Sequence, residues 1–268
     1  MAIFDCFQYF NEDHIADLRF NILNEFVDKF IIVESTVNHQ GKPKELHFDI
    51  NRYRKFKHKI NYIVVDDTPV ELKKPHIGGE SLVERHQRNS LLKGLSSAKD
   101  NDLIIISDVD EIPDLNKLNE FDKNNYAVFS QKMFMYKINF LNLKENNWHG
   151  SKMCLKKNLR SPQWLRNLKF KEYPFWRIDK VRNLQIIKNG GWHFSYLQTP
   201  ENISEKIKSF AHGEFNKSEI VDLKNIYSKI KNGQDIFDRG HNFKKVELDS
   251  SFPSYIINNK KKFEKWLI

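Results

Sequence analysis

The sequence has few cysteines, no long apolar run and no compositionally biased segment. Two cysteines among 268 residues, Cys6 and Cys154, cannot form a disulfide framework, so a reducing compartment is the simpler expectation. No stretch approaches the roughly 20 apolar residues that a membrane-spanning helix needs. The opening MAIFDCFQYFNED has no basic lead and does not resemble a signal peptide. We therefore expect a cytoplasmic protein.

The composition indicates an ordinary folded chain with a basic surface. Hydrophobic residues make up 40% and charged residues 29%, which is typical of globular domains and excludes intrinsic disorder. The net charge of +9 favours anionic partners, although a lysine-rich surface also serves solubility alone. A long basic arm and zinc-finger spacing are both absent, so no specific nucleic-acid partner is expected.

Apolar runs and helical patterns predict the architecture of the first half. Four runs that do not alternate predict buried strands at Ala2–Phe7, Phe30–Ser35, Ile60–Asp67 and Asp102–Pro113. Asn11 is a candidate N-cap of a first helix, and Ser81 with Glu84 is a capping-box pattern before a second. This order predicts an α/β protein with a mostly parallel central sheet flanked by helices.

Patterns in the second half are weaker. The segment Asn125–Phe140 predicts either one long strand or a hairpin, and the chain from there to Arg182 predicts irregular structure with short strands. Gly190–Tyr196 predicts a tight turn that leads into a strand. Pro200 stands at the start of a further helical pattern. We expect a C-terminal helical extension and one domain over residues 1–268.

The fourth run ends in three carboxylates, in the stretch LIIISDVDEIP. Asp108, Asp110 and Glu111 repel one another, and burying them together is costly unless a cation lies among them. A D-x-D motif at the end of a buried strand is a sensible way to hold Mg²⁺ or Mn²⁺ against a diphosphate. The alternative is that Asp108 or Asp114 merely caps a turn.

Other charged residues are predicted to share this edge of the sheet. Asp5, Glu34, Asp66 and Asp67 fall near the ends of predicted strands, and the carboxyl ends of parallel strands form the usual ligand site. Arg85 and Arg88 are three positions apart on the second helix and so share a face. They suit a bidentate clamp on a diphosphate, or else a solvated face paired with Glu84.

Six collinear segments together resemble glycosyltransferase family 17. They are Asp5–Glu12, Val27–Ser35, Gly41–Phe48, Glu84–Asn89, Ser107–Pro113 and Gly190–Tyr196. The resemblance covers about residues 2–235 and implies a GT-A (Rossmann-like) fold. It also implies a UDP-sugar donor, UDP-N-acetylglucosamine in characterised members, a divalent metal (Mn²⁺ or Mg²⁺), and inversion to a β-linkage. It divides the domain into a nucleotide-binding half, about 1–115, and an acceptor half, about 116–268.

The resemblance also implies roles for individual residues. Asp108 and Asp110 match the motif that faces the metal and the donor, and His193 is the candidate third metal ligand. The alternative for His193 is a core histidine among aromatic neighbours. Together with Asp108, the residues placed at strand ends or on the second helix are the predicted donor contacts: Asp5, Glu34, Asp67, Arg85 and Arg88. The alternative for a strand-end carboxylate is that it only caps a turn.

Inversion requires a general base that takes the proton of the acceptor hydroxyl. The segment SFAHGEFN supplies His212 and Glu214, and Asp179 is a further option. An acid matches the position of Glu214 in the vertebrate relative, whereas a histidine does not match His212. We therefore favour Glu214 as the catalytic base, with Glu111 and Asp179 as alternatives.

The sequence leaves other functions open. The chain lacks the anchor and stem of the Golgi enzymes of the family, so we expect a surface polysaccharide, lipopolysaccharide or other lipid-linked glycan as the acceptor rather than an N-glycan. Peripheral association with a membrane is a further hypothesis from the net charge. The competing functions are a nucleotidyl- or phosphotransferase with the same carboxylates, and a non-catalytic nucleotide-sugar-binding protein.

Overall fold

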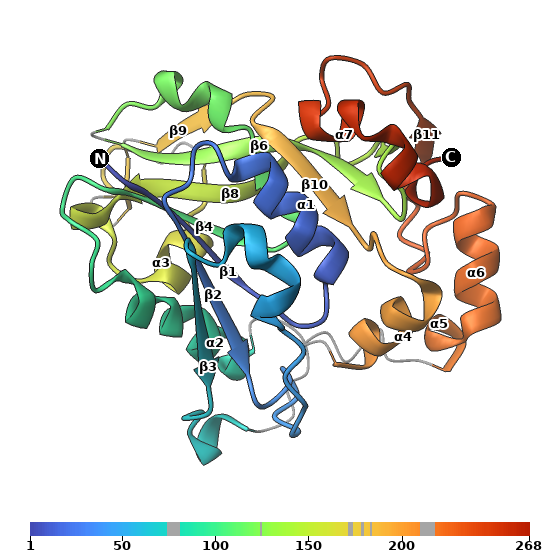
Figure 1. Cartoon of the computed structure of the whole chain (residues 1–268), viewed down its shortest axis with the longest axis horizontal. Helices are drawn as coiled ribbons and strands as arrows, with labels where there is room; N and C mark the ends of the chain where they lie inside the picture. Colours follow the sequence, from blue (N-terminus) through green and yellow to red (C-terminus); the bar gives the residue numbers. More distant parts are fainter. Residues whose placement is uncertain (74–80, 124, 171–173, 178–179, 183, 210–217) are drawn as a thin grey trace.

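The computed structural model describes residues 1–73, 81–123, 125–170, 174–177, 180–182, 184–209 and 218–268. Within them, a mixed sheet carries helices on both faces (Figure 1). The strands are β1 (Ile3–Gln8), β2 (Lys29–Ser35), β3 (Ile60–Val65), β4 (Leu103–Asp108), β5 (Glu111–Pro113), β6 (Tyr126–Met135), β7 (Phe140–Asn142), β8 (Trp148–Leu155), β9 (Leu184–Ile187), β10 (Gly191–Ser195) and β11 (Phe243–Lys245).

The helices are mostly short. The α-helices are α1 (Asp13–Leu23), α2 (Leu82–Asn89), α3 (Pro162–Asn167), α4 (Pro200–Ser209), α5 (Ser218–Val221), α6 (Leu223–Lys231) and α7 (Ser254–Asn258). The 3-10 segments are η1 (Ile50–Phe56), η2 (Val70–Leu72), η3 (Ser90–Leu95), η4 (Leu115–Glu120), η5 (Lys156–Asn158) and η7 (Lys260–Trp266).

Four parallel strands form the half of the sheet that the apolar runs predicted. They lie in the order β3-β2-β1-β4, and each pairs in parallel with its neighbour. Successive side chains point to opposite faces, so Phe30 and Ile32 enter one core while Ile31 and Val33 enter the other. Both faces are buried, which explains why the runs are continuous instead of alternating. The predicted α/β class with a mostly parallel central sheet is confirmed.

Different elements cover the two faces (Figure 1). The first core packs α1, η1, α7 and η7 against the sheet through residues such as Leu18, Phe56 and Phe263. The second core packs η3 and α3 against the opposite face, through Leu91 and Leu165. The helix α1 therefore lies across the strands that lead to residues Asp108–Glu111 at the end of β4, which we call the acidic loop.

The first predicted helix is shorter than its apolar pattern, in which Ile15, Leu18, Ile22, Phe26 and Phe30 recur at helical spacing. Its N-cap is Glu12 instead of Asn11, and it ends at Leu23. Ser81 does cap α2, since its hydroxyl accepts a hydrogen bond from the Glu84 backbone N–H at 3.4 Å. After eight residues α2 continues as the 3-10 segment η3.

The sheet becomes mixed beyond β4, where the sequence predicted short strands but gave no position for β8. This strand lies between β4 and β6 and is antiparallel to both. The signal was weak because β8 contains Gly150, Ser151 and Lys152, which have low strand propensity. Ser151 is buried and satisfied by a distant partner, the Ser107 hydroxyl at 2.8 Å. Such pairing depends on tertiary contacts and leaves no local pattern.

The C-terminal part is helical, as expected, but it returns to the sheet. Ile203 and Ile207 of α4 and Ile226 of α6 pack against β6 and β7 in a third core. The strand β11 then pairs antiparallel with β7. Between Tyr126 and Asn142 the chain forms the hairpin β6–β7 rather than one long strand. The turn into α4 positions a lysine of that helix near the acidic loop.

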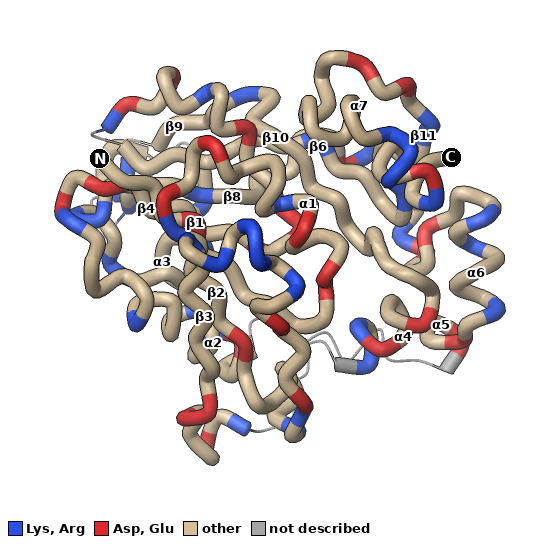
Figure 2. The backbone as a smooth tube through the Cα atoms, viewed as in Figure 1, with Lys and Arg blue, Asp and Glu red and all other residues tan. Residues whose placement is uncertain are grey.

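Charged residues are interspersed along the chain (Figure 2). The excess of basic residues is thus spread out and does not form a basic arm. No helix in the described part of the chain is long and apolar enough to cross a membrane.

A glycine fixes the contact between β10 and the strand after the acidic loop. Gly191 pairs with Pro113 and has a φ of +132°, and a Cβ there would lie 2.2 Å from the Ile112 carbonyl oxygen. Gly191→Ala should therefore lower the free energy of unfolding, measured by urea denaturation, by clearly more than the ~1 kcal/mol that left-handed backbone costs alone.

The matched control is Gly240→Ala. Gly240 also has a positive φ, +72°, but a Cβ there meets nothing within 4 Å. Equal losses at Gly191 and Gly240 would contradict a steric role for Gly191.

Candidate active site

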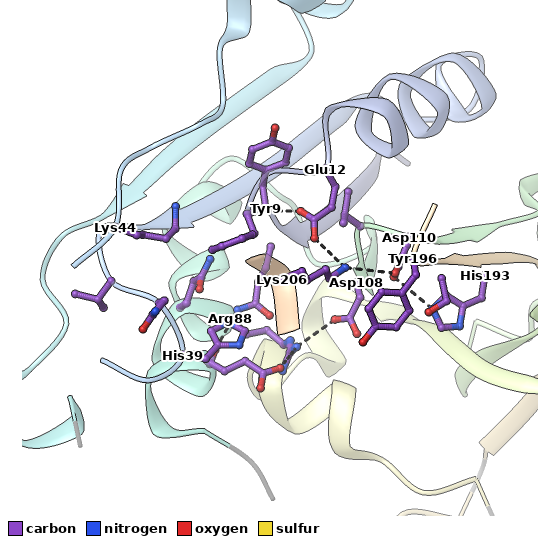
Figure 3. A pocket seen from close by; sticks show the side chains of 18 residues that line it. Tyr9, Glu12, His39, Lys44, Arg88, Asp108, Asp110, His193, Tyr196 and Lys206 are labelled. Carbon is purple, nitrogen blue, oxygen red and sulfur yellow. Dashed lines mark hydrogen bonds and ion pairs between the residues drawn. The ribbon is translucent and has the colours of Figure 1, made fainter. Parts of the chain in front are cut away.

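A cavity of about 230 Å³ lies at the carboxyl edge of the parallel strands (Figure 3). Its walls come from the segments after β1, β2 and β4, from α2 and α4, and from the end of β10. Its lining residues are Gln8, Tyr9, Phe10, Glu12, Val37, Asn38, His39, Lys44, Glu84, Gln87, Arg88, Asp108, Val109, Asp110, His193, Ser195, Tyr196 and Lys206. Open α/β sheets bind ligands at this edge, so the cavity is the candidate active site.

A buried ion pair supports the acidic loop from beneath. Asp5 and Arg19 are both 0% exposed, and the guanidinium binds both carboxylate oxygens at 2.6 and 2.7 Å. The remaining nitrogen, Nη1, donates to the backbone carbonyls of Asp108, Val109 and Glu111 at 3.2, 3.2 and 2.7 Å. Arg19 thus holds the backbone of the four-residue segment from Asp108 to Glu111 in one place.

Asp5 therefore occupies a different position from the one that the sequence suggested. It lies in the middle of β1, not at its carboxyl end, and it does not line the cavity. Its side chain binds Arg19, so its contribution in this structure is to the support of the loop.

Glu111 is also buried and faces the protein interior. Its Oε1 accepts hydrogen bonds from Trp148 Nε1 at 2.6 Å and from Arg166 Nη2 at 2.8 Å. Its Oε2 accepts the backbone N–H of Asp108 at 3.1 Å. Both oxygens thus hold neighbouring parts of the site, and Glu111 is not part of the cavity wall. A role as general base would require these bonds to break.

Asp108 lies in the cavity wall between two arginines. Its side chain is 40% exposed, with Oδ1 3.1 Å from Arg88 Nη2 and Oδ2 2.7 Å from Arg166 Nη2. Burial alone would raise the pKa of Asp108, but the two guanidinium groups lower it well below its ordinary value. Asp108 is therefore ionised at neutral pH.

Asp110 lies beside a histidine and a lysine. His193 Nε2 is 3.5 Å from Asp110 Oδ1, and Lys206 Nζ is 3.9 Å from Oδ2. Burial opposes ionisation of Asp110, but His193 and Lys206 lower its pKa. Burial likewise would lower the pKa of His193, while Asp110 raises it. The pair is therefore stabilised in its charged form.

Three other predicted donor contacts lie away from the cavity. Glu34 is 0% exposed and accepts hydrogen bonds from Lys44 Nζ, Tyr62 and the backbone of His47, which fixes the loop after β2. Asp67 is on the surface, bound to Lys93 at 2.7 Å. Arg85 is exposed and does not line the cavity.

Arg88 is in the cavity wall, but its guanidinium is already held by the protein. Nη1 donates to Gln163 Oε1 at 2.5 Å, and Nη2 reaches Glu84 at 2.6 Å and Asp108 at 3.1 Å. The side chain is 4% exposed. Arg88 thus lies in the cavity wall and Arg85 is exposed, although the sequence predicted that both share one face of the helix.

The residues considered as the general base, Glu214, Asp179 and His212, lie outside the described residues.

Several site residues were missed by the sequence reasoning. Glu12 and Tyr196 stood in the family-like segments without a role, and Arg166 stood in a part with no clear pattern. Arg19 follows Ile15 by four positions and so falls on the buried face of α1, which was the available signal. Lys206 similarly lies three positions after the buried Ile203.

Tyr196 is a strained residue at the cavity. Its backbone φ of 52° is uncommon for a residue other than glycine, and such conformations concentrate at functional sites. The ring lies 5.6 Å from Lys206 Nζ. The strain and the position together indicate that the turn after β10 is shaped for the site.

The fit of a divalent metal depends on Asp108 and Asp110. No group of three or more His, Cys, Asp or Glu side chains with metal-holding geometry occurs in the part of the chain that the structure describes. Mg²⁺-type sites, however, use one or two carboxylates and complete their shell with substrate phosphates and water. Both aspartates line the cavity, and His193 Nδ1 is buried without a hydrogen-bond partner among the described residues. The two carboxylates therefore fit a metal that takes its remaining ligands from a diphosphate and water.

Fold and cavity are those of a GT-A-like α/β protein. The chain belongs to glycosyltransferase family 17, whose family model matches residues 1–267. This confirms the resemblance noted in the six collinear segments.

Curated relatives are similar at low identity. The rat beta-1,4-mannosyl-glycoprotein 4-beta-N-acetylglucosaminyltransferase is 22% identical over 250 residues, which cover 83% of this chain and 46% of the relative. The human protein of the same name is 22% identical over 228 residues, covering 76% and 42%. The chain thus spans less than half the length of the curated relatives it matches.

Substitution of Arg88 and of Arg85 compares how much a buried and an exposed arginine of α2 contribute to stability. Arg88→Gln removes the buried cation that binds Glu84 and Asp108, so we expect a loss of about 2 kcal/mol or more in the free energy of unfolding. Arg85→Gln, on the exposed side of the same helix, should cost less than about 1 kcal/mol. Urea denaturation of both variants measures the difference, and similar losses would contradict the structural role of Arg88.

Proposed function

We propose that this protein is a glycosyltransferase that moves a sugar from a nucleotide-sugar donor to a glycan hydroxyl. The observation that carries the proposal is the placement of Asp108 and Asp110 in the wall of a cavity at the carboxyl edge of the sheet, in a member of glycosyltransferase family 17. The two alternatives from the sequence, a nucleotidyl- or phosphotransferase and a non-catalytic binding protein, have no such family support.

The donor is UDP-N-acetylglucosamine in this proposal, and the product linkage is β. Both details rest on the family resemblance and on the similarity to the rat and human proteins, which are named as 4-beta-N-acetylglucosaminyltransferases. The acceptor hydroxyl oxygen bonds to the anomeric carbon from the face opposite the leaving group, which inverts the configuration. The bond from that carbon to the β-phosphate oxygen breaks, and its electron pair stays on UDP. The hydroxyl proton passes to a general base.

Residues of this chain orient the reactants and balance their charge. Arg19 holds the backbone of the acidic loop, and Arg88 and Arg166 fix the carboxylate of Asp108. Asp108 and Asp110 would hold Mn²⁺ or Mg²⁺, which neutralises the charge that builds on the departing diphosphate. The proposed general base is Glu214, as in the sequence prediction.

The acceptor in this proposal is a polysaccharide, lipopolysaccharide or other lipid-linked glycan. A cytoplasmic location and peripheral contact with a membrane belong to the same proposal and rest on sequence features and net charge.

Asp110→Asn should abolish sugar transfer while leaving the fold intact. The variant keeps the size of the side chain but removes the negative charge that the reaction needs. Release of UDP from UDP-N-acetylglucosamine, with Mn²⁺ present, measures turnover, and we expect a loss of at least about 100-fold.

The control is Asp114→Asn, four residues further on. Asp114 caps η4 by accepting the Asn116 backbone N–H, and asparagine caps equally well. Unchanged turnover in Asp110→Asn would refute the site assignment. Release of UMP in place of UDP would indicate a phosphotransferase that moves the sugar phosphate, and release of the sugar 1-phosphate would indicate a nucleotidyltransferase.

Metal dependence has its own test in thermal stability. A ligand that binds only the folded state raises the melting temperature. UDP with Mn²⁺ should raise it by more than UDP alone or Mn²⁺ alone, because Asp108 and Asp110 would hold a metal whose charge also stabilises the bound diphosphate. Equal shifts with and without the metal would contradict a shared metal site.

A further inference from the structure

Lys206 is the cation that α4 brings into the cavity beside the acidic loop (Figure 3). The residue is only 9% exposed, yet its ammonium group lines the cavity. Nζ lies 3.0 Å from Glu12 Oε1 and 3.9 Å from Asp110 Oδ2. Lys206 thus joins the segment after β1 to the segment after β4, although it comes from the C-terminal half of the chain.

Arg88 and Lys206 are cations of the cavity wall that lie beside the aspartates, and their donor groups differ in geometry. The guanidinium of Arg88 is planar, and both its terminal nitrogens bind protein oxygens within 3.1 Å. An ammonium group has three donors on a flexible four-carbon stem and acts as a point charge. A phosphate oxygen in the cavity can therefore meet the ammonium group of Lys206 without the planar fit that a guanidinium requires.

Glu12 is anchored in a way that supports this arrangement. Its Oε2 accepts the backbone N–H groups of Phe10 and Asn11 at 3.0 and 3.1 Å, which leaves Oε1 directed at Lys206. The carboxylate therefore holds the ammonium group at the cavity wall, beside Asp110. Asp108, Asp110 and Lys206 line the same cavity, so a nucleoside diphosphate bound beside the aspartates would have its phosphate oxygens near the ammonium group.

We propose that Lys206 is a donor-binding residue whose ammonium group contacts the phosphate oxygens of the nucleotide-sugar and of the departing nucleoside diphosphate. This rests on the proposed glycosyl transfer and adds a cation from the acceptor half of the chain to the donor site. The contact is charge-assisted and involves a lysine that is only 9% exposed, and hydrogen bonds between ionised groups are about twice as strong as neutral ones. Donor binding is thereby coupled to the position of α4.

The experiment compares the binding of UDP and uridine, each with Mn²⁺, by isothermal titration calorimetry. Lys206→Gln should weaken UDP binding by about 10- to 100-fold, the usual range for a hydrogen bond to a charged group. Uridine binding should stay unchanged, because uridine has no phosphate. Lys206→Arg should recover most of the UDP affinity, and Lys208→Gln, at an exposed position of α4, should bind both ligands as the wild type does.

A second variant separates phosphate binding from folding. Lys206→Gln leaves Glu12 without its counter-ion, so the double variant Glu12→Gln/Lys206→Gln, which removes both charges, should fold and still bind UDP weakly. Wild-type affinity for UDP in Lys206→Gln, or an equal loss for UDP and uridine, would overturn the assignment while leaving the proposed function in place. A folded wild-type protein that binds none of UDP, CDP and GDP with Mn²⁺ would overturn the proposed function and the inference together.

Discussion

The site depends on one buried arginine. Asp108, Asp110 and Glu111 bring three negative charges within four residues, and a loop of this kind is unfavourable unless its backbone and its charges are both stabilised. Arg19 satisfies the backbone, because it donates to the carbonyls of Asp108, Val109 and Glu111. Asp5 in turn neutralises Arg19 by a bidentate pair inside the first core. The position of the acidic loop is thus tied to the packing of α1 on β1.

The three acids of that loop then have three different surroundings. Glu111 points inward and binds Trp148 and Arg166, Asp108 stands between Arg88 and Arg166, and Asp110 faces His193 and Lys206. Cations from α2, α3, α4 and β10 therefore surround one short segment. These elements are far apart in sequence, so the site forms only when both halves of the chain have folded together.

Much of the architecture followed from local patterns. The four parallel strands were predictable because strands buried on both faces are continuous apolar runs, and the cap at Ser81 was predictable from a hydroxyl and an acid three positions apart. The strand β8 and the end of α1 were not, because both are decided by packing. The sequence correctly predicted that Asp108, Asp110 and His193 lie close together. The predicted donor contacts of Asp5, Glu34 and Asp67 depended only on their nearness to strand ends. Several hydrogen-bond donors lie near a carboxylate at the end of a strand, and the tertiary structure determines which of them it binds.

By itself, the sequence determined the α/β class, the parallel half of the sheet and the acidic motif at its edge. It determined the family as well, through six collinear segments. Tertiary structure decided the direction in which each charged side chain points. It buried Glu111 while leaving Asp108 and Asp110 at the cavity, separated Arg88 from Arg85, and placed Lys206 between Glu12 and Asp110. The physical reason is that burying charges is costly, so each is directed by partners distant in sequence that local patterns do not encode.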